Sequence, residues 1–131
     1  MSLYRRLAVL FALLLLLIVA AANLGLGPAL FGFIYAIPYA DTAGHFILMG
    51  LLSLLISLGF GADRVQFLRL LKTSLFLGAL VTLEEITQLF LVNRTFSLVD
   101  LTADYAGIFL FGELGAVLRK HALLCALCDF A

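Results

Sequence analysis

Residues 7–26 read LAVLFALLLLLIVAAANLGL, a stretch with no charged side chain. A helix of about 20 apolar residues crosses a bilayer core of ~30 Å, so this stretch fits a membrane span. Three more apolar runs follow, at about residues 44–60, 70–92 and 98–118. Backbone polar groups in lipid must be satisfied within their own segment, so runs this long and evenly apolar predict helices rather than barrel strands. We therefore expect an all-α, four-transmembrane-helix bundle formed by a single domain, residues 1–131.

The composition of the whole chain agrees with this expectation. The 131 residues are 65% hydrophobic and 12% charged, and the mean hydropathy is +1.21. A soluble domain has roughly 45–50% apolar and 25% charged residues, so lipid is the natural solvent of this chain and membrane lipids are expected partners. The net charge is zero, which gives no electrostatic reason to expect nucleic-acid binding.

The alternative for the first run is a cleaved signal peptide. Arg5 and Arg6 precede the Leu-rich core, and three alanines at 20–22 are small residues of the kind found at cleavage sites. The apolar character continues past Asn23, however, and this favours a retained span.

The positions of Lys and Arg predict an orientation in the membrane. Seven of the eight basic residues lie before the first run, between the second run and the start of the third, in the first residues of the third, or after the fourth: Arg5, Arg6, Arg64, Arg69, Lys72, Arg119 and Lys120. Short cytoplasmic loops are enriched in Lys and Arg. We therefore expect a multi-pass protein of the bacterial plasma membrane with both termini in the cytoplasm and segments 27–43 and 93–97 outside. Pro28 and Pro38 argue against a continuous helix in the first of these segments.

Three of the runs, or the turns leading into them, carry two polar residues spaced four apart at the end predicted to face outward. This spacing places both side chains on one face of a helix. With Glu85 and Arg94, these pairs make up the candidate ligand-binding residues: Asp41, His45, Glu84, Glu85, Gln88, Arg94, Asp100 and Asp104. Counted inward from Arg94 at ~1.5 Å per residue, Glu84 lies about 15 Å deep. A charge near the bilayer centre costs at least ~2.5–3.5 kcal/mol. We therefore expect Glu84 or Glu85 to face the bundle interior, and the sequence leaves open which of the two does so.

Polar groups between membrane helices can also act only as packing contacts, worth about 0.6–2 kcal/mol each. The convergence of so many ionisable groups at one end favours an acidic recess that opens to the outside. A metal or other cofactor is not expected, because one histidine without an HExxH motif is a weak basis for a metal hydrolase. Cys125 and Cys128 form a single CxxC without a second pair, which is too little to predict a metal site or a disulfide framework.

The order of these polar residues resembles the VanZ-like family of small bacterial membrane proteins. The matching stretches, within roughly residues 39–118, are Asp41…His45-Phe46, Glu84-Glu85-x-x-Gln88 and Arg94-Thr95…Asp100…Asp104-x-x-Gly107. The resemblance implies a plasma-membrane protein of the cell envelope, since the founding member is tied to reduced susceptibility to teicoplanin; it implies no particular reaction. The chain departs from the family at Thr42, where Lys is frequent, and at Asp104, where Asn is usual. The recess should therefore be more negative than is typical of the family.

Three functions fit these features. The first is binding or modification of a lipid-linked or cell-wall component at the outer leaflet, with Glu84, Glu85 and His45 as the candidates for catalysis and Arg94 holding an anionic group. The second is an accessory subunit of a larger membrane complex, because four spans in 131 residues leave little surface outside the membrane. The third is a proton- or cation-coupled transporter, suggested by the intramembrane carboxylates. Apart from Glu113, no polar path continues through the halves of the spans that are predicted to face the cytoplasm. This argues against transport across the membrane.

Overall fold

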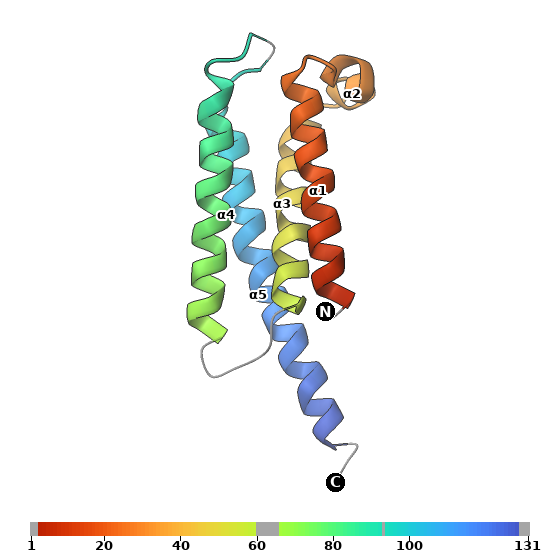
Figure 1. The fold of residues 1–131 in the computed structure, drawn as a ribbon, viewed down its shortest axis with the longest axis vertical. Helices are drawn as coiled ribbons and strands as arrows, with labels where there is room; N and C mark the ends of the chain where they lie inside the picture. The colour runs from red at the N-terminus through yellow and green to blue at the C-terminus, as the bar shows by residue number, and fades with distance from the viewer. Residues whose placement is uncertain (1–2, 60–65, 93, 129–131) are drawn as a thin grey trace.

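The structure is a computed structural model that describes residues 3–59, 66–92 and 94–128. It contains five helices and no strand in this described part: α1 (Leu3–Asn23), α2 (Gly27–Tyr35), α3 (Ala40–Gly59), α4 (Gln66–Gln88) and α5 (Leu98–Cys128). Figure 1 shows four long helices side by side, with the short α2 lying across one end of the bundle. The predicted all-α class is confirmed.

Three helices are long and apolar enough to cross a membrane, and four were predicted. They are α1, α3 and the part of α5 from Leu98 to Ala122. In the described part of the chain α4 is not among them, because charged residues occupy both of its ends: Arg69, Lys72, Glu84 and Glu85. The outer surface of the bundle is rich in exposed large apolar side chains, among them Leu16, Leu17 and Phe90. A surface of this kind is unusual for a protein in water.

The segment predicted to lie outside the spans contains a helix that the sequence did not reveal. Pro28 is the second residue of α2, a position where the missing N–H of proline leaves no hydrogen bond unmade. Pro38 lies in the turn between α2 and α3, and the following residue, Tyr39, has a φ of 61°. The prolines therefore interrupt a continuous helix here, as predicted, and still permit a short one.

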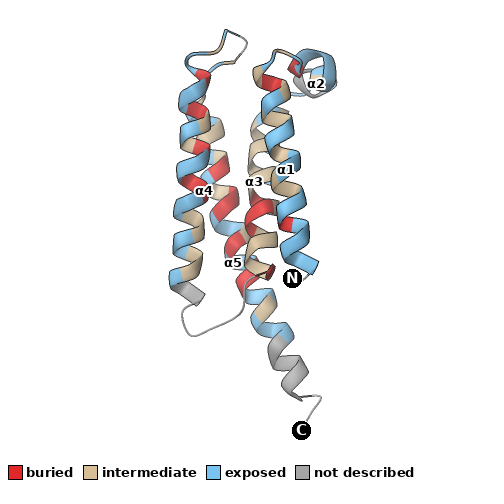
Figure 2. Ribbon diagram, viewed as in Figure 1, coloured by how far each residue is buried: buried red, intermediate tan, exposed pale blue. Residues whose placement is uncertain are grey.

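The most extensive contact in the bundle joins α3 to α5 through small residues. A Cβ atom added at Gly107 would lie 2.2 Å from the carbonyl oxygen of Phe46, so the backbones of α3 and α5 leave no room for a side chain at this position. Ser53 is buried in the same interface, and its hydroxyl donates to the carbonyl of Ile108 at 2.7 Å. Figure 2 shows buried residues on α3, α4 and α5 where these helices approach one another.

Two arginines lie at the end of the bundle where α1 begins and α3 finishes. The Nε of Arg5 donates to the carbonyl of Gly59 at 2.8 Å, and Arg119 donates to the carbonyl of Leu58. Cationic side chains stabilise the last carbonyls of a helix. The start of α1 and the end of α5 lie toward this end of the molecule (Figure 1). Arg64, one of the residues used to predict orientation, lies outside the described residues.

Candidate functional site

The candidate site lies at the other end of the bundle, where α3 and α5 begin and α4 finishes. Asp41 is in the first turn of α3, and Asp100 is in the first turn of α5. The N-terminal turn of a helix favours negative charge, because its free N–H groups point toward that end. The sequence therefore places two carboxylates where the helices themselves stabilise them.

Polar contacts between α3 and α5 fix the first part of the site. The Nδ1 of His45 lies 3.1 Å from the Oδ2 of Asp104. Asp104 is only 2% exposed. One turn away, the hydroxyl of Thr42 donates to the Oδ1 of Asp100 at 2.5 Å. Each pair joins one residue of α3 to one of α5, so both helices hold the site in place.

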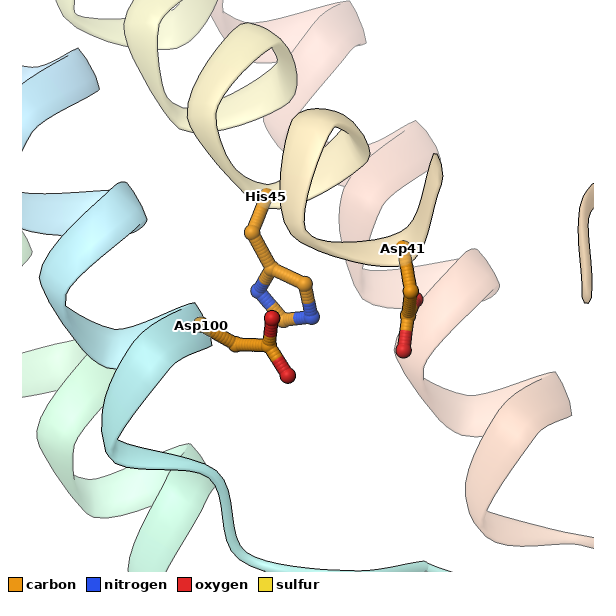
Figure 3. A group of neighbouring side chains, drawn as sticks. All are labelled: Asp41, His45 and Asp100. Carbon is orange, nitrogen blue, oxygen red and sulfur yellow. The ribbon is translucent and has the colours of Figure 1, made fainter. Parts of the chain in front are cut away.

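Asp41, His45 and Asp100 point toward a shared space between α3 and α5 (Figure 3). One potential ligand atom from each residue lies within 4.8 Å of the others. Asp41 is exposed, whereas His45 and Asp100 are half-buried. The three side chains thus form a compact group at the rim of the bundle.

Residues near the end of α4 form the second part of the site. The Nε2 of Gln88 donates to the Oε2 of Glu84 at 2.7 Å. The guanidinium of Arg94 lies 3.9 Å from the Oε1 of the same carboxylate. Glu84 is therefore held between an amide and a cation, and its side chain is 22% exposed.

Glu85 occupies a different environment from its neighbour. It is 1% exposed, and its Oε2 accepts the backbone N–H of Ser97 at 3.0 Å. Its Oε1 accepts from the Nε2 of Gln88 at 3.2 Å. Glu85 therefore joins the end of α4 to the segment that leads into α5.

A cavity of about 390 Å³ adjoins the polar residues. Its polar end contains Asp41, His45, Glu84, Arg94 and Asp104. The rest of its wall is almost entirely apolar: Ala12, Leu15, Leu16, Ile18, Val19 and Ala22 of α1, Phe31 of α2, Ala40, Gly44, Leu48, Met49 and Leu52 of α3, and Leu77, Leu80 and Val81 of α4. The cavity therefore has the character of an amphiphile-binding site, with a long apolar part and a polar part at one end.

Two carboxylate oxygens in this wall have no hydrogen-bond partner. They are the Oε1 of Glu84 and the Oδ1 of Asp104, and both atoms are buried. A buried acceptor without a partner costs roughly 1–3 kcal/mol, and more when it is charged. The polar end of the cavity can thus accept further hydrogen bonds at these two oxygens.

The structure brings five of the eight predicted site residues together in the cavity wall. The other three, Glu85, Gln88 and Asp100, lie beside the wall and hold neighbouring residues. Sequence reasoning missed Ser97, whose hydroxyl accepts the N–H of Asp100 at 3.2 Å and so caps α5. The pattern Ser-x-x-Asp before an apolar run could have revealed this cap.

Comparisons with protein-family models, curated proteins and solved structures give no match for this chain. The resemblance to the VanZ-like family therefore rests on the residue order in the sequence and stays a prediction.

Proposed function

We propose that this chain is a multi-pass protein of the bacterial plasma membrane that binds or modifies a lipid-linked component of the cell envelope at the outer leaflet. The resemblance to the VanZ-like family extends the proposal to a role in glycopeptide resistance. The single observation that carries the proposal is the cavity, which joins an apolar wall from three long helices to a cluster of charged side chains. An acyl or prenyl chain matches the wall, and a headgroup matches the cluster.

The proposed topology has four spans, in which α4 is added to the three apolar helices α1, α3 and α5. The charged ends of α4 reduce its hydropathy, but each end meets a suitable environment: Arg69 and Lys72 would reach the cytoplasmic headgroups, and Glu84 and Glu85 face protein partners. Arg5 and Arg119 lie together at the end opposite the carboxylates. Because Lys and Arg are enriched on the cytoplasmic side, this distribution supports cytoplasmic termini and a site that faces outward.

The polar end of the cavity suggests what the headgroup contains. Arg94 offers a guanidinium, which suits a phosphate or carboxylate. The Oε1 of Glu84 and the Oδ1 of Asp104 have no hydrogen-bond partner, so they can accept hydrogen bonds from the hydroxyl or ammonium groups of a headgroup. A phosphate-linked sugar on a lipid carrier combines both kinds of group. In this proposal Glu84 and His45 lie against the headgroup and are the candidates for proton transfer, whereas Glu85 has a positioning role.

The proposal predicts that a photoreactive prenyl-phosphate sugar labels the purified protein and that charge at the polar end controls the labelling. Arg94→Ala and Glu84→Gln should each reduce labelling by about tenfold, because a hydrogen bond to a charged group contributes roughly 1.5–3 kcal/mol. Glu113→Gln is the matched control, since Glu113 is exposed on α5 and lies outside the cavity wall. Equal labelling of all three variants and the unaltered protein would contradict the proposal.

One observation favours a second candidate, an accessory subunit of a larger membrane complex. The C-terminal part of α5 extends beyond the other helices of the bundle (Figure 1), and its sequence from Ala122 to Cys128 is apolar. A helix of this kind suits docking against another membrane subunit. Extraction in a mild detergent separates the two candidates, because an accessory subunit comigrates with larger polypeptides and an independent protein migrates alone.

A further inference from the structure

We propose that Asp41, His45 and Asp100 bind a divalent transition metal ion of the zinc type. The three residues come from two helices and converge on one space, with one potential ligand atom from each within 4.8 Å of the others (Figure 3). Asp41 and His45 lie one turn apart on α3, and α5 supplies Asp100 at its first turn. An imidazole combined with two carboxylates suits zinc and its neighbours better than calcium or magnesium, which prefer oxygen ligands alone.

The contact between His45 and Asp104 is the second observation that points to a metal. The Nδ1 of His45 is engaged by the Oδ2 of Asp104 at 3.1 Å, so Nε2 is the ring nitrogen left for a ligand. A metal-binding histidine almost always gives its other nitrogen to a carboxylate, a carbonyl or a water, and this contact orients the ring. The arrangement around His45 thus has the form of a carboxylate–histidine–metal triad.

The burial of Asp104, the carboxylate that contacts His45, is consistent with the same conclusion. Asp104 is 2% exposed, and its Oδ1 atom is buried without a hydrogen-bond partner. A buried carboxylate with an unsatisfied oxygen is costly unless a positive charge lies nearby. The guanidinium of Arg94 is 3.9 Å from Glu84, and it is the one Lys or Arg side chain in the described cavity wall. The His45 ring is the cationic partner of Asp104 when it is protonated. A divalent ion bound to the Nε2 of His45 would supply positive charge at the same place when the ring is neutral.

The geometry requires only a small adjustment to accept the ion. Zinc lies about 2.0–2.2 Å from nitrogen and oxygen ligands, so ligand atoms around a tetrahedral ion are about 3.4 Å apart. The observed group is somewhat wider than this. Asp100 is held by the hydroxyl of Thr42, whereas Asp41 is exposed and can turn toward the other two ligands. Three protein ligands leave a fourth position open, and two of them, Asp41 and His45, line the cavity.

Zinc titration of the chelator-treated protein in detergent tests the site without any lipid, so its outcome is independent of the proposed function. The experiment uses the full chain and, in parallel, a Cys125→Ser/Cys128→Ser version that removes the tail thiols. We expect one Zn²⁺ per chain in both. His45→Ala, Asp41→Asn and Asp100→Asn should each weaken binding by at least about tenfold, and Asp104→Asn by about 10–100-fold through the orientation of His45.

His121→Ala is the matched control, because His121 is the second histidine of the chain and is exposed on α5. It should leave zinc binding unchanged. Substitution with Co²⁺ adds a spectroscopic signature, since a d–d band of a four- or five-coordinate ion should appear and should vanish in His45→Ala. Asp41→Asn alters an exposed side chain and keeps the test valid if other variants fold poorly. Absence of zinc binding, or binding that survives both His45→Ala and Asp41→Asn, would overturn the proposal.

Discussion

Glu84 and Glu85 are neighbours in the sequence, yet their surroundings differ. Glu84 lines the cavity beside Arg94, whereas Glu85 is buried and accepts the backbone N–H of Ser97. The chain thus uses one carboxylate to face a ligand and the other to hold α4 against the start of α5.

This difference predicts different effects on stability. Glu85→Ala should lower the free energy of unfolding by about 1–3 kcal/mol, because the N–H of Ser97 loses its buried acceptor. Glu84→Ala should cost less than about 1 kcal/mol, since Gln88 keeps Glu85 as an acceptor. Unfolding in detergent, followed by circular dichroism, measures both. Equal losses would show that the two carboxylates are structurally equivalent.

The sequence predicted that at least one of these two carboxylates faces the interior but could not say which. Adjacent residues of a helix point about 100° apart, and Gln88 lies within reach of both. Which carboxylate is buried and which faces the cavity depends on their partners Ser97 and Arg94, which belong to the next segment of the chain. Only the tertiary arrangement brings those partners to α4.

The packing of helix α3 against helix α5 sets the distance between the site residues of the two helices. A Cβ atom at Gly107 would meet backbone atoms of α3 rather than a movable side chain. His45 adjoins Phe46, and Asp104 lies one turn before Gly107, so these two side chains can bridge the helices because the backbones are so close. The packing of small residues therefore determines whether the polar pairs can form.

Gly107→Ala should destabilise the protein by about 1–3 kcal/mol through overpacking, and it should also weaken zinc binding by widening the gap between His45 and Asp100. Gly44→Ala is the control on α3, because a Cβ atom there meets nothing within 4 Å; its stability should stay the same or rise slightly through helix propensity. Thermal unfolding compares the two variants. A Gly107→Ala protein as stable as Gly44→Ala would contradict the close approach of the helices.

The long helices could be predicted because each apolar run is close to the length of a membrane span. Residues 44–59 of the second run lie within α3 and residues 98–118 lie within α5, although α5 continues to Cys128. α2 could not be predicted in the same way: it is short, and its prolines indicate a helix start and a turn equally well. The cavity depends on packing between α1, α3 and α4, and no local pattern in the sequence describes it.

At the scale of the whole molecule, basic residues lie at one end of the bundle and most of the carboxylates at the other. Arg5 and Arg119 cap the end of α3, and the carboxylates gather where α3 and α5 begin. The cavity runs inward from the acidic end along the apolar faces of the helices. The central claim is that this end forms a recess that is reached from outside the cell.

Labelling of single cysteines in intact cells with a charged, membrane-impermeant thiol reagent tests this claim most directly. Cys125→Ser/Cys128→Ser supplies a background without thiols, and Val92→Cys, at a fully exposed position, serves as the positive control. Glu84→Cys should react from outside, because a thiolate forms in a hydrated recess. Leu83→Cys, at the adjacent exposed position, should stay unreactive because it faces lipid. The account would be contradicted if Glu84→Cys reacted only after cell lysis, or if both positions reacted equally.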